Sequence, residues 1–431
     1  MSQTTTDQQL TEKGFASYLP IIIACCTMCG VPSAILISSA SVFYEPIANE
    51  FNVEIARISV WMSCMLISCA IFSPLMGSLI ARYDIRPLLL AGATLEAAIF
   101  ALFSVSQGPW MFWVGGFLAG LSNIVLLGMA TATLVNRWFK THVGVIIGFC
   151  TAFTGLGGVL FLPLAQKIIA THGWRTAYLT FAIITFVVTI PVILICVRSN
   201  PSERGLLPYG TAEAARNSSD GNVAEPTSVR PSVGMRSSVF WIVIVFGFFV
   251  NLVCQIPGYF PRYVSWINEQ ADSGLATKAF IAGATLAAVA QAGNAIGKIG
   301  LGFFSDLSVS RAIAVLSGAG ALGIIFVWQF PSTILLPIGS LIFGFFIAGV
   351  LVLCPMVARR IFGAGKYYPV FYARISVAVT LGGAAGNVVW PYVAEHWGGF
   401  GTVFAIALGA IVVVVITGFM AYAQRDRLPR E

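Results

Sequence analysis

Two cationic side chains, Lys298 and Arg374, lie inside long apolar segments of the sequence, and neither has an acidic residue at helical spacing to neutralise it. A charge in the apolar part of a membrane is costly, so such a residue is a functional candidate. Two cations without a fixed counter-ion suggest that the negative charge arrives with a ligand. We therefore expect Lys298 and Arg374 to bind a small organic anion.

Neutral polar side chains could complete this binding site. Gln291 and Asn294 share a helical stripe with Lys298, because the three residues stand at i, i+3 and i+7. Both cations lie seven residues from the same end of their segments, which places them at one depth, about 10 Å from that end. Further candidates for ligand contacts are Asn251, Gln255, Asn123 and Tyr372.

A structural role is the alternative for each of these candidates. The amides and the tyrosine could serve helix packing. Lys298 could extend its amine along its stem to the membrane surface, and Arg374 could bond to carbonyl groups at a helix end.

Glu96 is the only carboxylate well inside an apolar segment. Because burial disfavours the charged form of a carboxyl group, Glu96 is a candidate for proton coupling. The alternative is a permanently protonated or surface-reaching side chain without a part in transport.

The composition requires a membrane environment. The chain has 431 residues, of which 58% are hydrophobic and 10% charged, against about 25% charged in soluble domains. A soluble core stops growing beyond about 250 to 300 residues, so this composition excludes a soluble enzyme. The sequence has no P-loop, HExxH or GxSxG motif, and we expect no cofactor or metal. The nine cysteines lie in apolar segments and are interpreted as small buried hydrophobic residues.

Apolar segments long enough to cross a bilayer, about 20 residues each, occur twelve times. They span 17–43, 57–81, 88–106, 110–135, 143–168, 176–197, 238–262, 277–305, 312–330, 333–358, 367–393 and 400–424. We predict an all-α membrane protein with twelve transmembrane helices in two pseudo-symmetric six-helix bundles. The predicted bundles are 17–197 and 237–424, with a flexible cytoplasmic linker at 198–236 and cytoplasmic tails at 1–16 and 425–431.

The positions of the basic residues indicate the orientation, because cytoplasmic loops are enriched in Lys and Arg. With both termini inside, 17 of the 24 Lys and Arg residues are cytoplasmic, 5 are external and 2 lie within spans. This split, rather than nucleic-acid binding, accounts for the net charge of +7. We expect a multi-pass protein of the plasma (inner) membrane with both termini cytoplasmic.

The two halves of the sequence repeat each other. Gly77 is followed by Arg86 nine residues later, and Gly302 is followed by Arg311 at the same spacing, with Asp306 between them. The segment Thr154-Gly155-Leu156-Gly157-Gly158 has a counterpart in Thr380-Leu381-Gly382-Gly383. Parallel duplication of six-helix units is typical of one class of transporters.

The twelve spans, the central loop and the pattern of Gly302, Asp306 and Arg311 resemble the major facilitator superfamily over nearly the whole chain. Trp138-Phe139-Lys140, followed by Gly144, Gly148 and Gly155-Leu156-Gly157-Gly158, resembles its monocarboxylate and oxalate:formate porter branch. The sequence departs from these patterns at two places. Ala81 stands where the superfamily has Asp, with an acid displaced to Asp84, and the first span lacks the acidic-Gly-Gly-Trp signature of animal monocarboxylate porters.

The resemblance implies that the eighth and eleventh helices line a central cavity in which Lys298 meets a substrate carboxylate. It also implies gating roles for Gly77, Arg86, Gly302, Asp306 and Arg311. The expected function is secondary active transport of small organic carboxylates by alternating access, with proton symport or, alternatively, anion exchange of the oxalate:formate type.

Two other functions remain as alternatives, an efflux pump for amphipathic compounds and a transporter-like ligand sensor. The expected partners are the organic anion, protons or a counter-anion, and the lipid bilayer, with no nucleic acid. We expect a functional monomer.

Overall fold

The computed structural model describes residues 12–53, 55–212, 229–272, 279, 281, 283–425 and 428. Within these residues the fold is helical, and the extended backbone is limited to one isolated bridge between Phe139 and Tyr209. The predicted tails, at 1–11 and over most of 426–431, and the middle of the predicted linker, at 213–228, lie outside the described residues.

The helices of the first half match its six predicted spans. They are η1 (Phe15–Tyr18), α1 (Leu19–Met28), η2 (Cys29–Ser33), α2 (Ala34–Ser38), α3 (Ser41–Phe51), α4 (Ile55–Arg82), α5 (Ile85–Ser104), α6 (Pro109–Asn123), η3 (Ile124–Met129), α7 (Ala130–Trp138), α8 (Val143–Ile184), η4 (Thr185–Thr189) and α9 (Ile190–Cys196). The fifth and sixth spans meet within α8 at Gly173, where φ is 83° and ψ is 165°. Glycine tolerates this backbone conformation because it has no Cβ, so α8 consists of two helices that join at Gly173.

The helices of the second half match the other six predicted spans. They are α12 (Ser238–Cys254), η6 (Ile256–Tyr259), α13 (Phe260–Asp272), α14 (Gly283–Leu307), α15 (Val309–Gln329), α16 (Leu335–Ile347), α17 (Leu353–Phe362), α18 (Tyr368–His396) and α19 (Phe400–Ala423). The tenth span, predicted as one helix over 333–358, is divided into α16 and α17.

Nine helical stretches of the described chain are long and apolar enough to cross a membrane. One of them, Val143–Cys196, contains two predicted spans. Two predicted spans do not meet this requirement of length and apolar composition. One is α14, which carries the polar stripe of Gln291, Asn294 and Lys298, and the other is divided into α16 and α17. The fold class predicted from the sequence, an all-α membrane protein, is therefore confirmed.

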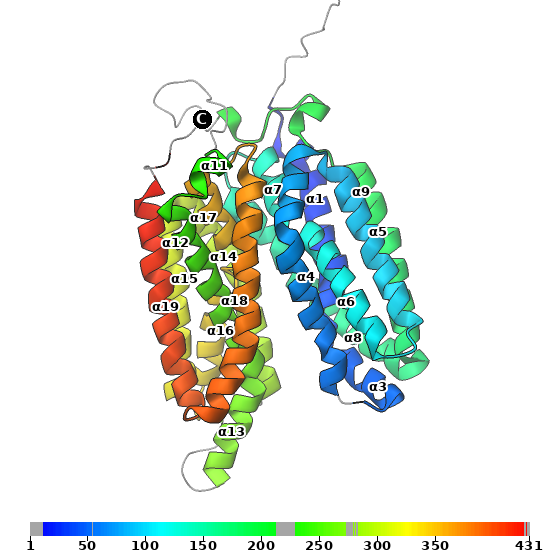
Figure 1. Cartoon of the computed structure of the whole chain (residues 1–431), viewed down its shortest axis with the longest axis vertical. Coiled ribbons are helices and arrows are strands. Elements are labelled where there is room, and N and C mark those ends of the chain that lie inside the picture. Colours follow the sequence, from blue (N-terminus) through cyan, green and yellow to red (C-terminus); the bar gives the residue numbers. More distant parts are fainter. Residues whose placement is uncertain are drawn as a thin grey trace, which may run out of the picture.

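The main helix pairs that join the halves are α8 with α14 and α4 with α18. The halves converge at the end that carries the linker and diverge toward α3 and α13 (Figure 1). Each contact depends on a glycine of the sequence repeat. A Cβ on Gly302 would lie 2.3 Å from the carbonyl oxygen of Gly144, and a Cβ on Gly77 would lie 2.2 Å from the Cβ of Ala373. Both repeat glycines therefore permit close approach between the halves.

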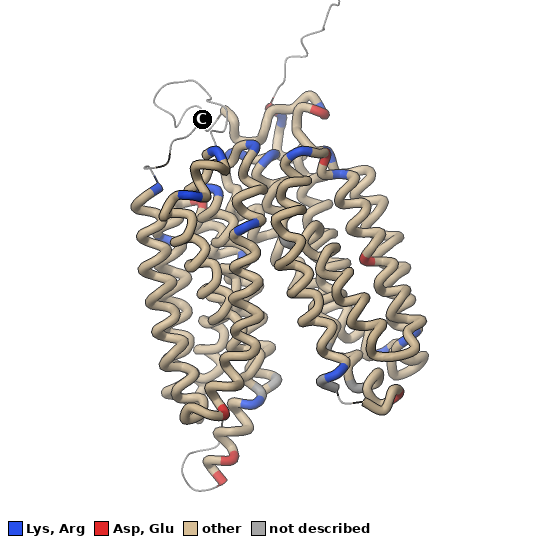
Figure 2. Tube along the Cα trace, in the orientation of Figure 1, with Lys and Arg blue, Asp and Glu red and all other residues tan. Residues whose placement is uncertain are grey.

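Basic residues gather at the convergent end of the bundle (Figure 2). This end also carries both described ends of the linker, around η5 (Pro201–Arg204) and α11 (Pro231–Gly234). The positive-inside rule relates such an accumulation to the cytoplasmic side.

The two described ends of the linker are packed against the helices. Tyr18 donates from its hydroxyl to the carbonyl oxygen of Leu207 at 2.6 Å, and Tyr209 donates from its backbone N–H to Trp138 O at 2.9 Å. On the other side, Val229 donates to Phe362 O at 3.0 Å and is fully buried. Each described end of the predicted linker therefore buries apolar side chains and pairs its backbone with a bundle, and the flexibility of 198–236 stays a prediction.

Candidate functional site

Lys298 is buried in α14, with 4% of its surface exposed. Its ammonium donates to Thr154 Oγ1 at 2.8 Å and to the backbone oxygen of Thr151 at 3.3 Å. Both acceptors belong to α8, in the other half of the protein. They are neutral, so the positive charge has no carboxylate partner among its hydrogen bonds. An ammonium has three N–H donors, which leaves one for a further acceptor.

The position of Lys298 follows from close packing of α14 on α8. A Cβ on Gly148 would lie 2.1 Å from the backbone oxygen of Lys298. Because only glycine permits this approach, the next turn of α8, with Thr151 and Thr154, comes within reach of the lysine amine. Gly148 thus permits the close approach of the helices, and Thr151 and Thr154 accept the hydrogen bonds of Lys298.

Arg374 lies on α18 and is exposed. Its side chain makes no hydrogen bond or salt bridge to any other residue that the structure describes. Its guanidinium is therefore open to a ligand. The equal depth expected for Lys298 and Arg374 stays a prediction.

Tyr372, the aromatic candidate next to Arg374, is buried with 4% of its surface exposed. Its ring stacks on Tyr368 with centroids 5.8 Å apart. Ring packing is therefore its role in this conformation.

The polar stripe of α14 is organised around two amides. Asn294 donates from Nδ2 to Gln291 Oε1 at 3.1 Å, while its own buried Oδ1 has no hydrogen-bond partner. Gln291 is exposed. Both side chains retain polar atoms for a ligand on the stripe that Lys298 shares.

Asn251 of α12 and Gln255, the residue after the end of α12, make hydrogen bonds at a contact between helices. Asn251 donates to the backbone oxygen of Val379 on α18 at 2.7 Å, and Gln255 donates to Asn251 Oδ1 at 2.9 Å. A Cβ on Gly383 would lie 2.5 Å from Asn251 Nδ2. These contacts agree with the packing alternative for both amides.

Asn123 occupies the last position of α6, directly before the π-helical turn η3. Its Oδ1 is buried and has no hydrogen-bond partner. Short π-helical turns within α-helices often occur at functional sites. Asn123 therefore stays a candidate for ligand contact.

Glu96 is fully buried in α5 and pairs with Ser122 of α6, whose Oγ lies 2.5 Å from Glu96 Oε2. The same Oγ donates to the backbone oxygen of Gly92 at 3.0 Å. The same hydroxyl donates to Glu96 Oε2, so its one proton is shared between the two acceptors. The other carboxyl oxygen of Glu96, Oε1, is buried and makes no hydrogen bond.

Asp306 links the halves at the convergent end. Its carboxylate accepts the backbone N–H groups of Gly144 and Val145 at 2.7 and 2.9 Å. These are amides of the first turn of α8, which has no side-chain cap of its own. A carboxylate at a helix N-terminus satisfies free N–H groups and interacts favourably with the helix dipole. Asp306 therefore caps a helix of the opposite half.

Arg359 and His142 lie close enough to Asp306 to act on it electrostatically. Arg311, which the sequence repeat placed with Asp306, is exposed. The positive charge nearest to Asp306 on a helix of its own half is therefore Arg359 of α17. Arg311 does not take this place, because the carboxylate of Asp306 points toward α8.

Arg86, the other arginine of the repeat, donates from Nη2 to the backbone oxygen of Leu194. Its backbone N–H donates to Asp84 Oδ1 at 2.9 Å. Burial alone would raise the pKa of Asp84, but hydrogen bonds from Ser199 Oγ and from Arg86 N–H outweigh it and hold this pKa below its usual range. Asp84 therefore caps α5 as a charged carboxylate.

Thr151, Thr154 and Arg359 are the residues that sequence reasoning did not select. Thr154 begins a repeated glycine motif and stands three residues after Thr151, one turn of a helix. The sequence shows this spacing, but it does not show that the two threonines lie close to Lys298. Within the described chain, no group of three His, Cys, Asp or Glu residues is arranged to hold a metal ion.

A family model described as Major Facilitator Superfamily matches residues 26–333. Human monocarboxylate transporter 11 is 24% identical over 294 residues, which cover 67% of this chain and 57% of that protein. The oxalate:formate antiporter of Oxalobacter formigenes is 24% identical over 395 residues, which cover 89% of this chain and 85% of that protein. The chain spans about half the length of the first curated relatives that it matches.

The fold is similar to crystal structures of the Escherichia coli fucose:proton symporter FucP. One of them has a TM-score of 0.67 and 14% identity, and the alignment covers 94% of this chain and 99% of FucP. A second FucP structure, described as outward in conformation, has a TM-score of 0.64. At this identity the likeness concerns the fold alone.

Proposed function

Because the chain belongs to the Major Facilitator Superfamily, whose matched members are transporters, we propose that it carries small organic carboxylates across the membrane by secondary active transport. The observation that carries this proposal is the environment of Lys298. A fully desolvated ammonium with neutral acceptors and one remaining donor is a binding site for an anion. The carboxylate of a substrate supplies the missing charge.

Two of the relatives favour this chemistry. One is a monocarboxylate transporter and the other exchanges oxalate for formate. Arg374, exposed on α18, is the second cation of the proposed site. A guanidinium can hold a carboxylate with two parallel hydrogen bonds, and the polar stripe of Gln291 and Asn294 offers further hydrogen bonds.

The contact between the halves supports alternating access as the proposed mechanism. Lys298 is bonded to Thr154 across the boundary between α14 and α8. A carboxylate that binds Lys298 changes the charge at this contact, so occupancy of the site acts on the contact between the halves. A ligand shifts a conformational equilibrium by its differential affinity for the two states.

The convergent, basic end is the cytoplasmic end in this proposal, and both termini are cytoplasmic. The conformation is then outward-facing. We assign the protein to the plasma (inner) membrane and propose that the monomer is the functional unit.

Proton symport is the proposed coupling, with electroneutral anion exchange as its alternative. Glu96 is not the proposed proton carrier in this scheme, because it is fully buried and its carboxyl group already accepts a hydrogen bond from Ser122. Exchange requires no protein carboxyl group at all, since the positive site is refilled by a second anion.

The test is a thermal-shift screen of the purified protein against organic anions, followed by titration of the best ligand. A ligand that binds the folded state raises its stability by mass action. Replacing Lys298 by Gln should weaken binding roughly ten- to a hundredfold, since a hydrogen bond to a charged group contributes about 1.5 to 3 kcal/mol. Lys298→Arg keeps the charge and should retain part of the binding.

Arg374→Lys should lose more affinity than Lys298→Arg, because a single ammonium cannot replace a two-pronged guanidinium. The matched control is Lys167→Gln, which removes an exposed lysine outside the proposed site. Unchanged carboxylate affinity in folded Lys298→Gln and Arg374→Gln variants would contradict the proposal and favour efflux of amphipathic compounds.

A further inference from the structure

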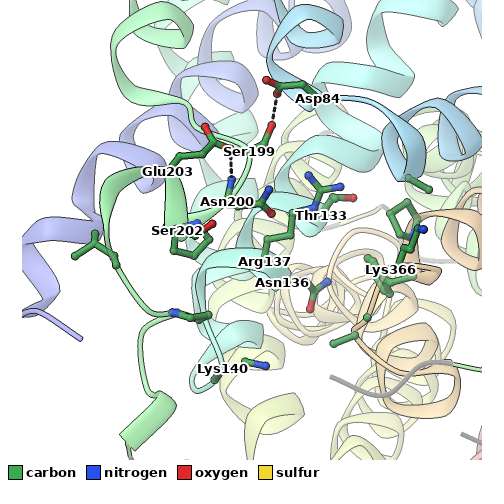
Figure 3. Close-up of a pocket in the computed structure, with 18 of the residues that line it drawn as sticks. Asp84, Thr133, Asn136, Arg137, Lys140, Ser199, Asn200, Ser202, Glu203 and Lys366 are labelled. Carbon is green, nitrogen blue, oxygen red and sulfur yellow. Dashed lines mark hydrogen bonds between the residues drawn. The ribbon is translucent and has the colours of Figure 1, made fainter. Parts of the chain in front are cut away.

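A cavity of about 660 Å³ lies at the convergent end of the protein, and neither Lys298 nor Arg374 lines it. One wall comes from the ends of α4 and α7 and from linker residues 199–208, all packed on the first half. The other wall is the loop 364–369, which leads into α18 of the second half (Figure 3). The volume lies in the range of small-molecule sites, roughly 300 to 1,000 Å³.

The cavity has an excess of positive charge. Its charged lining residues are the cations Arg82, Arg137, Lys140 and Lys366 and the acids Asp84 and Glu203. Both acids already accept hydrogen bonds from neutral donors, Asp84 from Ser199 Oγ and Glu203 from the backbone N–H of Asn200. Burial, together with the nearby Arg359, lowers the pKa of Lys140. An anion in the cavity would relieve this crowding of cations.

A buried hydroxyl without a partner also borders the cavity. Thr133 is 1% exposed, and its Oγ1 makes no hydrogen bond. Helical threonines commonly bond to the carbonyl group one turn earlier, and a buried unpaired hydroxyl is costly. Figure 3 shows Thr133 and Arg137 on the face of α7 that borders the cavity, with Lys366 across from them. A ligand with acceptor oxygens would satisfy the hydroxyl.

The sequence repeat shows that this contact lacks a carboxylate at the position equivalent to Asp306. Asp306 stands four residues after Gly302 and joins the halves by capping α8. The residue four after Gly77 is Ala81, which lines the cavity and has no acceptor. The contact of α14 with α8 therefore has a carboxylate, Asp306, that the pseudo-symmetric contact of α4 with α18 lacks.

The backbone of α18 does not provide the donors for an anion. The N–H groups of Tyr368 and Val370 already donate to Gly365 O and Tyr367 O, at 3.0 and 3.1 Å. The side chains that line the cavity are therefore the donors that we consider for an anion. A guanidinium fork, ammonium groups and a hydroxyl suit a phosphate group, which offers several oxygens and up to two charges.

We propose that this cavity binds a phosphate group, carried by inorganic phosphate, by a soluble phosphorylated metabolite or by an anionic lipid headgroup. The bound phosphate takes the place of the carboxylate that Ala81 lacks. Because it touches Arg137 of the first half and Lys366 of the second, it stabilises the conformation in which they lie close together. Bound phosphate therefore opposes opening of this end of the transporter.

The experiment measures phosphate binding to the purified full chain in nanodiscs of phosphatidylcholine, by equilibrium dialysis of labelled inorganic phosphate and by melting temperature. Phosphate should raise the melting temperature above that in chloride at matched ionic strength. Thr133→Val and Lys366→Gln should each weaken phosphate binding about tenfold. Lys167→Gln, at an exposed site elsewhere, should bind phosphate as the wild type does.

Ala81→Asp provides a second, independent variant. Its tethered carboxylate should occupy the site, raise the melting temperature without phosphate and abolish the response to phosphate. Nanodiscs with phosphatidylglycerol test the lipid headgroup as the source of the phosphate. The lipid is the source if phosphatidylglycerol stabilises the wild type, soluble phosphate does not, and Lys366→Gln and Ala81→Asp remove the stabilisation.

The proposal is overturned if neither soluble phosphate nor phosphatidylglycerol stabilises the wild type, or if all variants respond as the wild type does. No carboxylate is needed in these measurements. Their failure is therefore distinguishable from failure of the proposed transport function.

Discussion

The ammonium of Lys298 crosses the boundary between the two halves and donates to Thr154 Oγ1 at 2.8 Å. Lys298 belongs to α14 and Thr154 to α8, so the cation proposed to bind substrate is also part of the contact between the halves. Substrate binding and closure of this contact therefore depend on the same charge.

Removing the acceptor should weaken this contact. Thr154→Val keeps the side-chain shape but takes away the hydroxyl that holds the buried ammonium, and hydrogen bonds to charged groups contribute about 1.5 to 3 kcal/mol. We expect a lower melting temperature and weaker carboxylate binding, because the amine loses its orientation. The measurements are thermal unfolding and ligand titration. Thr176→Val, at an exposed helical threonine, is the control, and equal behaviour of the two variants would refute the role of Thr154.

The cap that Asp306 provides should control opening of the basic end. Asp306→Ala removes both acceptors of the Gly144 and Val145 N–H groups, and loss of a helix cap costs about 0.5 to 2 kcal/mol. We expect the population to shift toward conformations in which this end is open. Distances between spin labels at Tyr83 and Leu307, both exposed, report the shift. Asp306→Asn should have a smaller effect, since one acceptor oxygen remains, and unchanged distances in both variants would exclude the cap as a latch.

Glu96 should tolerate an amide. Glu96→Gln keeps an oxygen that accepts the hydrogen bond from Ser122 and has nearly the same size and shape as the glutamate side chain. We expect uptake driven by a pH gradient and exchange of labelled substrate to be mildly and equally affected. Ser122→Ala should be less stable by about 1 to 3 kcal/mol, because it leaves a buried carboxyl unpaired. Selective loss of gradient-driven uptake in Glu96→Gln would instead make Glu96 the proton carrier.

A pH-dependent contact lies at the opposite end of the protein. A hydrogen bond from Arg175, supported by one from Trp174 Nε1 at 2.5 Å, holds the pKa of Glu50 below its usual range despite partial burial. The carboxylate therefore stabilises the fold above the ordinary glutamate pKa of about 4.3. This contribution is lost as the pH falls through the lowered pKa. The difference in melting temperature between wild type and Glu50→Gln should be largest near neutral pH and shrink in acid; a difference independent of pH would contradict this assignment.

The orientation is open to a direct test. A cysteine at Ser202, exposed beside the linker, should resist impermeant thiol reagents in intact cells and react after permeabilisation, because the basic end is proposed to be cytoplasmic. A cysteine at Thr171, exposed near the Gly173 junction, should react in intact cells. The reverse pattern would invert the topology.

The sequence by itself determined the membrane class, the twelve helices and the superfamily. Each depends on local or periodic properties: apolar length, the spacing of Gly77 and Gly302 in the two repeats, and the placement of Lys and Arg. Lys298 could be selected as a candidate for the same reason, since the cost of an intramembrane charge does not depend on the details of packing.

Tertiary structure alone decided the partners of these residues. Thr154 stands 144 positions before Lys298, and Asp306 caps α8 instead of pairing with Arg311, its neighbour in the chain. Such contacts form between helices that are distant in sequence, and the approach of the helices is set by the glycines at 144, 148 and 302. The sequence indicates which groups are costly to bury. The close packing of the two halves decides which atoms stabilise those groups.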